Sequence, residues 1–168
     1  KYSGLKMISI KKNGYHGGSL RTVAVKSSSK FKEFNANRLI SFENKNKIYN
    51  LKFYKDMMKK INLKKINLID KLIKLSQKGY ILSGIGAGAK SNTFLTFYGL
   101  NNNVIKFLTD SSKFKQNKFT PVTRIVIKND NELAKYKKIA CLILSWNISD
   151  IIVKKIKKIN RNIKFIKT

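Results

Sequence analysis

The sequence is poor in the residues on which much enzyme chemistry depends. Its 168 residues include one cysteine, one histidine and one tryptophan, and the acidic residues number eight. One cysteine cannot form an intramolecular disulfide or a cysteine-based metal site, so Cys141, inside an apolar run, is expected to be a buried thiol. The sequence contains no Ser-His-Asp order, no metal-ligand spacing and no pair of carboxylates. It therefore offers few residues that could carry out a hydrolase mechanism.

Long hydrophobic runs are also missing. No apolar stretch approaches the roughly 20 residues that a membrane-spanning helix needs, and the N-terminal residues lack the pattern of a signal peptide. We therefore expect a cytoplasmic protein with no membrane partner. A hydrophobic content of 42%, with 11% aromatic residues, is that of a globular chain and not of a disordered one. The sequence gives no indication of an oligomeric state.

Positive charge is abundant, at 37 lysines and arginines and a formal net charge of +29. Nucleic-acid binding is nevertheless not our expectation, because arginine, which reads phosphates and base edges bidentately, is present at only Arg21, Arg38, Arg124 and Arg161. The lysines accompany asparagine, isoleucine, phenylalanine and tyrosine along the whole chain, as an AT-rich coding sequence would produce. Such a charge still attracts anionic ligands in a salt-dependent way.

The N-terminal residues predict a β-hairpin. Apolar residues alternate over 5–12 and 20–26, and the glycine-rich segment 13–19 between them contains His16. A two-stranded ribbon is marginally stable alone, so the hairpin is expected to complete a sheet formed by upstream sequence. Because the chain begins at Lys1 and not at methionine, we expect it to be part of a longer protein.

Helical periodicity follows the hairpin. A short helix is expected within 35–47, and apolar residues at three- and four-residue spacing predict an amphipathic helix over 51–78, with a break near 62–65. Gly79 stands where a helix-terminating glycine is expected. A basic amphipathic helix can bind a membrane surface or a partner, but packing of its apolar face on its own domain is the favoured interpretation.

Residues 79–168 alternate between strand and helix patterns. Strands are expected at 80–83, 104–108, 124–127, 139–145 and 163–166, separated by helical or turn segments. The fold class is therefore α/β: a Rossmann-like doubly wound parallel sheet, preceded by the hairpin and the long helix. Ligands of such sheets bind beyond the carboxyl ends of the strands, where the segments 84–88, Asp110 and 146–147 should converge.

A glycine-rich turn links the first of these strands to a helix. Gly84, Gly86 and Gly88 follow the strand 80–83, and a helix can open at Ala89. Unpaired backbone N–H groups and the positive end of a helix dipole then face one point, which is an anion site suited to the phosphates of a nucleotide. The spacing also fits the dinucleotide fingerprint. The alternative is a tight turn chosen for packing.

Several side chains can complete this site. Polar groups at the start of the helix can supplement the amides on a phosphate, or serve only as helix-start residues: Lys90, Ser91, Asn92 and Thr93. Asp110 can hold ribose hydroxyls or simply form a turn, and Trp146 can stack on a base or cap the core. His16 is the one side chain with a pKa near neutrality, about 6.5 when unperturbed, and is either a general base or structural.

Four motifs in one order resemble the C-terminal half of S-adenosylmethionine-dependent sugar C-methyltransferases. They are His16-Gly-Gly-Ser-Leu-Arg21, Gly84-Ile-Gly-Ala-Gly-Ala-Lys-Ser-Asn-Thr93, Asp110 with Lys115-Gln116 and Thr120-Pro121, and Leu144-Ser-Trp-Asn147. The resemblance implies a cysteine-rich zinc module and a methyl-donor domain upstream of this chain. Residues 1–27 would then be the terminal hairpin of the methyltransferase domain, 28–78 a helical linker, and 79–168 a nucleotide-sugar-binding domain.

The resemblance further implies methyl transfer to a carbon beside a ketone. His16 would remove the acidic proton, leaving an enolate to attack the sulfonium methyl group. S-adenosylmethionine and zinc would bind in the upstream parts and no metal in this chain. The nucleotide-diphosphate sugar would contact Ser19, Arg21, Gly84, Gly86, Ala87, Lys90, Ser91, Asn92, Thr93, Asp110, Trp146 and Asn147.

The sequence departs from that family at two positions. Ile85 replaces an aromatic residue, and Ser91 stands where glycine is usual. The zinc cysteines and the methyl-donor glycine motif are absent, so this chain alone is not expected to methylate a substrate. Two other functions remain compatible with the residues: a nicotinamide-binding Rossmann module, and a basic module for RNA or membranes.

Overall fold

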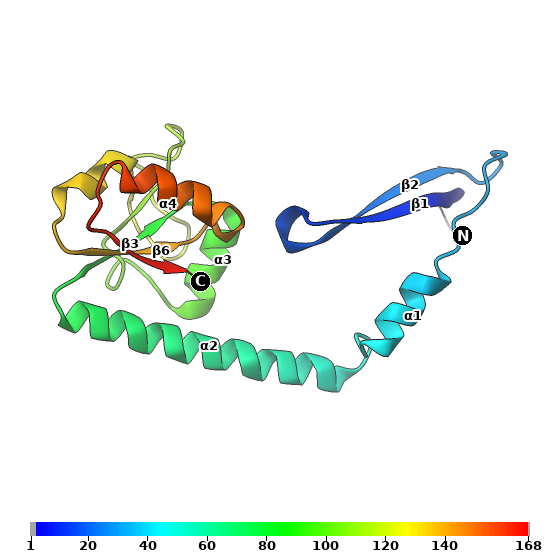
Figure 1. Cartoon of the computed structure of the whole chain (residues 1–168), viewed down its shortest axis with the longest axis horizontal. Coiled ribbons are helices and arrows are strands. Elements are labelled where there is room, and N and C mark those ends of the chain that lie inside the picture. The colour runs from blue at the N-terminus through cyan, green and yellow to red at the C-terminus, as the bar shows by residue number, and fades with distance from the viewer. Residues whose placement is uncertain (1–2, 168) are drawn as a thin grey trace. The chain divides into compact units, whose positions relative to one another are not determined.

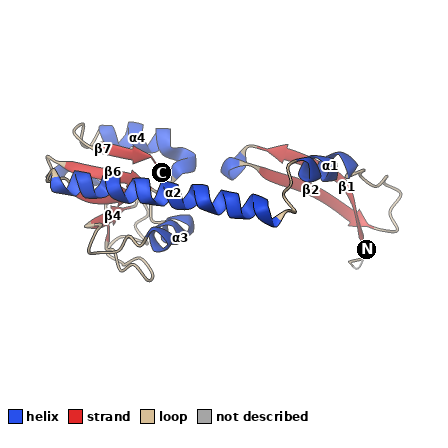
Figure 2. Ribbon diagram, turned by 90° about the horizontal axis from the view of Figure 1, so that it is seen from below, coloured by secondary structure: helices blue, strands red, loops and turns tan. Residues whose placement is uncertain are grey.

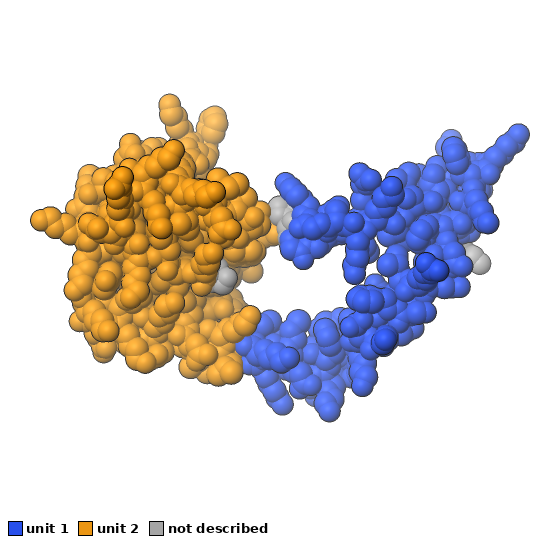
Figure 3. All heavy atoms as spheres, in the orientation of Figure 1, with its two compact units in different colours: residues 1–61 blue, residues 62–168 orange. Residues whose placement is uncertain are grey.

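A computed structural model of the chain describes residues 3–167, apart from the side chain of His16. The chain divides into two compact units, Lys1–Ile61 and Asn62–Thr168, which are coloured separately in Figure 3. This division falls inside the long helix, whereas the predicted domain boundaries follow residues 27 and 78. Those boundaries concern the domains of a longer protein and stay predictions.

The first unit contains the expected hairpin. Strands β1 (Leu5–Asn13) and β2 (Ser19–Lys26) pair antiparallel, and the short 3-10 helix η1 (Tyr15–Gly17) joins them. Gly17 and Gly18 have φ values of +86° and +126°, which side-chain-bearing residues rarely adopt. No residue of the two strands is fully buried, and the expectation that an upstream sheet covers them stays a prediction.

Two helices follow the hairpin (Figure 1). Helix α1 spans Asn37–Lys45, and helix α2 runs without interruption from Leu51 to Gln77. The break expected near 62–65 is wrong, because asparagine and lysine lower helix propensity only slightly and neither proline nor glycine is present there. Helix α2 ends as expected, since Gly79 adopts a φ of +76° and the Tyr80 amide donates to the Leu75 carbonyl.

The second unit is built on a five-stranded parallel sheet with the strand order β5-β4-β3-β6-β7. The strands are β3 (Ile81–Ile85), β4 (Phe107–Thr109), β5 (Ile127–Lys128), β6 (Ile139–Ile143) and β7 (Lys164–Lys167). Counted along the sheet domain, this order is 3-2-1-4-5, which is the doubly wound Rossmann arrangement. The predicted fold class is therefore confirmed.

Helices cover both faces of this sheet (Figure 1, Figure 2). On one face, Leu72 of α2 and Leu95 of α3 (Ala89–Tyr98) join a core that includes Leu108 and Leu142. On the other face, the 3-10 helix η2 (Asp130–Lys135) and helix α4 (Ser149–Lys157) pack on Phe107 and neighbouring strand residues. The 3-10 helix η3 (Trp146–Ile148) leads from β6 into α4. The chain thus leaves β3 towards one face and β6 towards the other.

Two strands are shorter than expected and lie further along the chain. Strands at 104–108 and 124–127 were expected, whereas β4 occupies Phe107–Thr109 and β5 only Ile127–Lys128. Ile105 and Ile125 are fully buried although neither lies in a strand, so apolar patterning there reflects burial and not sheet pairing. Arg124 adopts a φ of +54°, which is incompatible with an extended strand.

Candidate functional site

The candidate site is the carboxyl edge of the sheet at the topological switch point. Because the connections after β3 and β6 lead to opposite faces, their loops separate and open a crevice between adjacent strands. The sequence predicted that the glycine turn, Asp110 and the segment after β6 converge here. The Ala87 amide lies 2.8 Å from Asp110 Oδ2, so the convergence of the glycine turn and Asp110 is confirmed. Ser91 Oγ lies 3.4 Å from the carbonyl oxygen of Leu144, the residue directly after β6, whereas a place for 146–147 at the same point stays a prediction.

The turn begins later than its sequence indicated. Gly84 lies inside β3 and not in the turn, and a Cβ at this position would lie 2.7 Å from a Leu108 methyl carbon and 2.9 Å from one of Leu144. Gly84 is thus required by packing between strands, and its predicted contact with a nucleotide stays a prediction. Gly86 forms the turn itself, with a φ of +97°, and its added Cβ would lie 2.2 Å from Ser145 Oγ.

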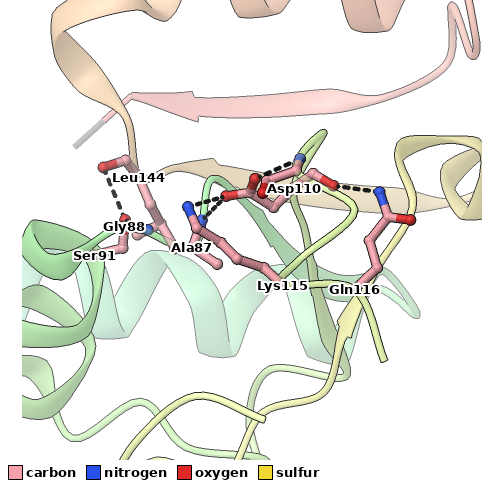
Figure 4. A network of polar contacts seen from close by, with 8 residues as sticks. Ala87, Gly88, Ser91, Asp110, Lys115, Gln116 and Leu144 are labelled. Atoms are coloured by element: carbon pink, nitrogen blue, oxygen red, sulfur yellow. Dashed lines mark hydrogen bonds and ion pairs between the residues drawn. The ribbon is translucent and has the colours of Figure 1, made fainter. Parts of the chain in front are cut away.

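The amides of the turn are bonded within the protein (Figure 4). Gly86 donates to the Thr109 carbonyl at 2.7 Å, and Gly88 donates to Ser91 Oγ at 3.2 Å. Ala87 donates to the Asp110 carboxylate. The three amides of the turn therefore already have acceptors within the protein, one of which is a carboxylate, and the predicted contact of the turn with a phosphate stays a prediction.

Asp110 is the centre of this network. Its Oδ2 also lies 3.1 Å from Lys115 Nζ, its Oδ1 accepts from the Ser112 amide at 2.9 Å, and its carbonyl accepts from Gln116 Nε2 at 2.9 Å. Burial alone would raise the pKa of Asp110, but the two amide donors and Lys115 outweigh it and hold the pKa below its usual value. The Lys115-Gln116 pair in the sequence thus serves to fix Asp110.

Replacing Asp110 by asparagine is expected to destabilise the sheet unit by about 1–2 kcal/mol at neutral pH. A carboxylate offers two acceptor oxygens to the Ala87 and Ser112 amides, whereas the amide nitrogen of asparagine would face one of these donors. Because the folded pKa is lowered, this stabilisation is present above the unfolded pKa of about 3.9 and is lost as the pH falls through the folded value.

The measurement is urea denaturation of the wild type and Asp110→Asn between pH 7 and pH 2. The difference in unfolding free energy should shrink below about pH 4, where the unfolded chain takes up a proton, and should be lost once the folded carboxyl is also neutral at lower pH. Asp70→Asn is the control, since Asp70 forms only an exposed ion pair with Lys74 on α2. A difference that stays constant over the whole pH range would contradict the proposed charge dependence.

Some polar side chains at the start of α3 are bonded within the protein, and others have no partner among the described residues. Ser91 is 1% exposed and its hydroxyl donates to the Leu144 carbonyl while accepting from Gly88, so it caps the helix and ties it to β6. Thr93 donates to the Ala89 carbonyl. Lys90 is exposed, and no acidic side chain among residues 3–167 pairs with it, while Asn92 Oδ1 is buried without a partner there.

Trp146 lies in η3, directly after β6 and near α3. Its ring is 6.4 Å from that of Phe94 in a tilted arrangement, and the residue remains 39% exposed. Both the packing and the stacking interpretations of Trp146 are thus compatible with its position. Asn147 beside it is exposed.

The site residues that were predicted in the hairpin belong to the first compact unit, not to the sheet unit. The backbone of His16 lies in η1, and its side chain lies outside the described part of the structure. Ser19 Oγ donates to Asn13 Oδ1 at 2.5 Å, and Arg21 is exposed on β2 opposite Lys11. The contacts of His16, Ser19 and Arg21 with substrate stay predictions.

A cavity of about 320 Å³ opens at the crevice on the face covered by α4. The sequence analysis did not predict several residues that line this cavity, namely Thr109, Ser145 and four residues of α4. A usable signal was present, because Thr109 is the last residue of β4 and Ser145 follows β6 closely, at the same edge as the glycine turn.

The described residues contain no group of three or more histidine, cysteine, aspartate or glutamate side chains that could hold a metal ion. Within residues 3–167, no helix combines the length and apolar character needed to cross a lipid bilayer. Cys141 is fully buried in β6, where burial raises its thiol pKa to about 12, so it is not a nucleophile at neutral pH.

Comparison with known proteins places the chain in a family. The chain is similar to the C-methyltransferase NovU of Streptomyces niveus, with 23% identity over 151 residues. That match covers 89% of this chain but 36% of the relative, so the chain spans little more than a third of that protein's length. The family model of the C-methyltransferase C-terminal domain matches residues 14–168. The chain therefore belongs to the C-methyltransferase C-terminal domain family.

Proposed function

We propose that this chain is the C-terminal part of an S-adenosylmethionine-dependent C-methyltransferase that acts on a nucleotide-activated keto-deoxysugar, and that its sheet unit binds the nucleotide. The observation that carries the proposal is the family match over residues 14–168. A doubly wound sheet with a cavity at its switch point supports it, because nucleotides bind at this edge of such sheets.

The methyl donor is assigned to a part of the protein outside this chain. S-adenosylmethionine would supply an electrophilic methyl group on sulfur. The one glycine turn of the sheet unit is a poor site for it, because Thr109, Asp110 and Ser91 already accept hydrogen bonds from its amides. The zinc that the family resemblance implies is likewise proposed for an upstream part of the protein.

The role of this chain in the reaction is to hold and orient the substrate. Binding energy from the nucleotide, remote from the reacting carbon, positions the keto-sugar for proton removal and methyl transfer. The net charge of +29 attracts the diphosphate, and Lys90 is an exposed cation directly after the glycine turn. His16 remains the proposed base that removes the proton beside the ketone.

A nicotinamide-binding module is the competing function, and one observation argues against it. Asp110 stands at the end of the second strand, where a dinucleotide fold uses an acidic residue for ribose hydroxyls. Its carboxylate here instead accepts from the Ala87 amide, the Ser112 amide and Lys115. An acidic group held in this way is poorly placed to bind a ribose.

Thermal stability of the chain with added nucleotides tests the proposal. Thymidine diphosphate at 100 times its dissociation constant should stabilise the fold by about 2.7 kcal/mol, whereas NAD should have no effect. Lys90→Gln should weaken binding, whereas Lys157→Gln, with the same change in charge at the far end of α4, should not. Stabilisation by NAD, with none by thymidine, uridine or guanosine diphosphate, would contradict the proposal.

A further inference from the structure

The first unit has no buried core. Of the residues between 3 and 61 whose side chains the structure describes, none is buried. Large apolar side chains are nevertheless frequent there, and four on the first half of α2 are 39–46% exposed: Phe53, Tyr54, Met57 and Met58. Because apolar burial is what offsets the entropy lost on folding, this unit needs a surface outside itself to cover such side chains.

The exposed side chains on α2 continue the face of the helix that packs on the sheet. Positions 54, 57, 58, 61, 65, 68, 72 and 75 recur at three- and four-residue spacing and therefore share one face. Leu72 and Leu75 are buried against the sheet, whereas every residue from 51 to 60 is exposed. We call the start of this face the α2 stripe, which consists of Tyr54, Met57, Met58 and Ile61.

The residue types of the α2 stripe are those enriched at the centres of protein interfaces. Two of the three methionines of the chain belong to it, and the Tyr54 ring contacts that of Phe53 edge-on, with 5.3 Å between centroids. Methionine adapts its shape to a partner, and aromatic side chains bury a large area on binding. An exposed apolar patch of this kind indicates an interaction site.

Two possible occupants fit the α2 stripe poorly. A flat lipid bilayer along this face would meet the sheet unit, because Leu72 and Leu75 hold that unit against the same face of the continuous helix. A second copy would place lysines against lysines, because residues 51–65 contain six lysines and one acidic residue. Like charges across an interface oppose association.

The charges beside the α2 stripe favour an acidic partner. Lys60 and Lys64 follow Met57 and Ile61 by three positions, so each lies next to the stripe on the helix surface. Both are exposed, and no ion pair among the described residues includes either of them. A surface that covers the stripe and carries carboxylates at its edge would pair with these lysines.

The missing core also bears on the source of this partner. A unit without buried residues needs a covering surface at all times, and a surface on the same polypeptide is always present at high effective concentration. The chain spans only 36% of the length of its relative, so a full-length enzyme of that size has ample preceding chain to supply this surface.

We propose that the α2 stripe packs on an apolar surface, rimmed by carboxylates, of the polypeptide that precedes Lys1 in the full-length enzyme. The inference rests on the proposed function only in making this chain the C-terminal part of a longer enzyme. It assigns an interface to the first half of α2, whereas the sequence analysis favoured packing of the whole helix on its own domain.

Thiol labelling of Met57→Cys in a full-length enzyme that contains this chain tests the interface. Leu63→Cys is the matched control, because Leu63 is 59% exposed on the same helix and points away from the stripe. Maleimide should react about tenfold more slowly with Met57→Cys than with Leu63→Cys, and mass spectrometry of the digested protein locates the label. Cys141 does not compete, because it is fully buried. Equal rates would overturn the interface.

A zero-length carbodiimide cross-linker tests the acidic rim. Lys60 and Lys64 should form amide links to aspartate or glutamate residues that precede Lys1, whereas Lys52, exposed on the opposite side of α2, should not. Links from Lys60 or Lys64 to a second copy, detected in a mixture of isotopically labelled and unlabelled enzyme, would overturn the proposal. Protection of Met57→Cys only after addition of phosphatidylcholine–phosphatidylglycerol vesicles would also overturn it, in favour of a lipid surface.

Failure of this interface is distinguishable from failure of the proposed function, because labelling needs no substrate. If Met57→Cys is protected and no nucleoside diphosphate binds, the interface stands and the proposed nucleotide binding falls. If thymidine diphosphate binds and the two thiols react equally, only the interface is overturned.

Discussion

Gly86→Ala is expected to destabilise the sheet unit by roughly 3 kcal/mol, through strain and overpacking together. Gly86 has a φ of +97°, which alanine adopts only under strain. The new Cβ would also lie 2.2 Å from Ser145 Oγ, 3.2 Å from Ser145 Cβ and 3.4 Å from its amide nitrogen. The contact at 3.4 Å is an ordinary one and rotation of the hydroxyl relieves the first, but Ser145 Cβ must still shift slightly to relieve the contact at 3.2 Å.

Gly99→Ala provides the comparison that isolates the contact with Ser145. Gly99 has a φ of +71° at the end of α3, and a Cβ there would meet no atom within 4 Å. Gly99→Ala should therefore lower the free energy of unfolding by about 1 kcal/mol, from backbone strain alone. Urea denaturation measures both variants, and equal losses would contradict the role assigned to Ser145. If Gly86→Ala does not fold, the double variant with Ser145→Gly should recover a folded protein.

The fold was predictable because its signals are local and repeated. Continuous apolar runs such as 139–144 indicate buried parallel strands, and the alternation of strands with helical segments indicates a doubly wound sheet. The boundaries of the strands could be predicted less well from the sequence. Ile105 and Ile125 are apolar because they are buried, and only the course of the chain shows that they lie outside β4 and β5.

The sequence predicted where the candidate site lies but not which hydrogen bonds it contains. The fold rule that ligands bind at the carboxyl edge correctly brought the glycine turn and Asp110 together. It could not show that Asp110 occupies the Ala87 amide, because this depends on the path of the irregular chain between β4 and β5, which delivers Lys115 and the Ser112 amide.

Gly84 illustrates a general ambiguity of glycine patterns. A glycine is selected equally by a turn with positive φ and by close packing of neighbouring chains. Gly86 has the first property, and Gly84, between Leu108 and Leu144, has the second. The fingerprint spacing cannot separate these causes. A nucleotide contact at Gly86 or Gly88 therefore does not imply one at Gly84.

His16→Gln in a full-length enzyme that contains this chain is expected to lower kcat by roughly 10²–10⁴-fold. His16 is the one histidine of the chain, and an unperturbed imidazole, with a pKa of about 6.5, is suited to remove the proton beside a ketone at neutral pH. Glutamine keeps the size and polarity of the side chain but cannot accept a proton. The KM for the nucleotide-sugar should change little, because the proposed function assigns nucleotide binding to the sheet unit.

Exchange of the substrate hydrogen in D₂O separates proton removal from every other step. The wild-type enzyme should exchange the hydrogen beside the ketone for deuterium, and His16→Gln should slow this exchange by the same factor as kcat. Lys11→Gln is the control, since Lys11 is an exposed residue of β1 whose loss changes the charge of the hairpin without removing a base at neutral pH. Unchanged exchange in His16→Gln would assign the proton to a base outside this chain, because no other side chain in it titrates near neutrality when unperturbed.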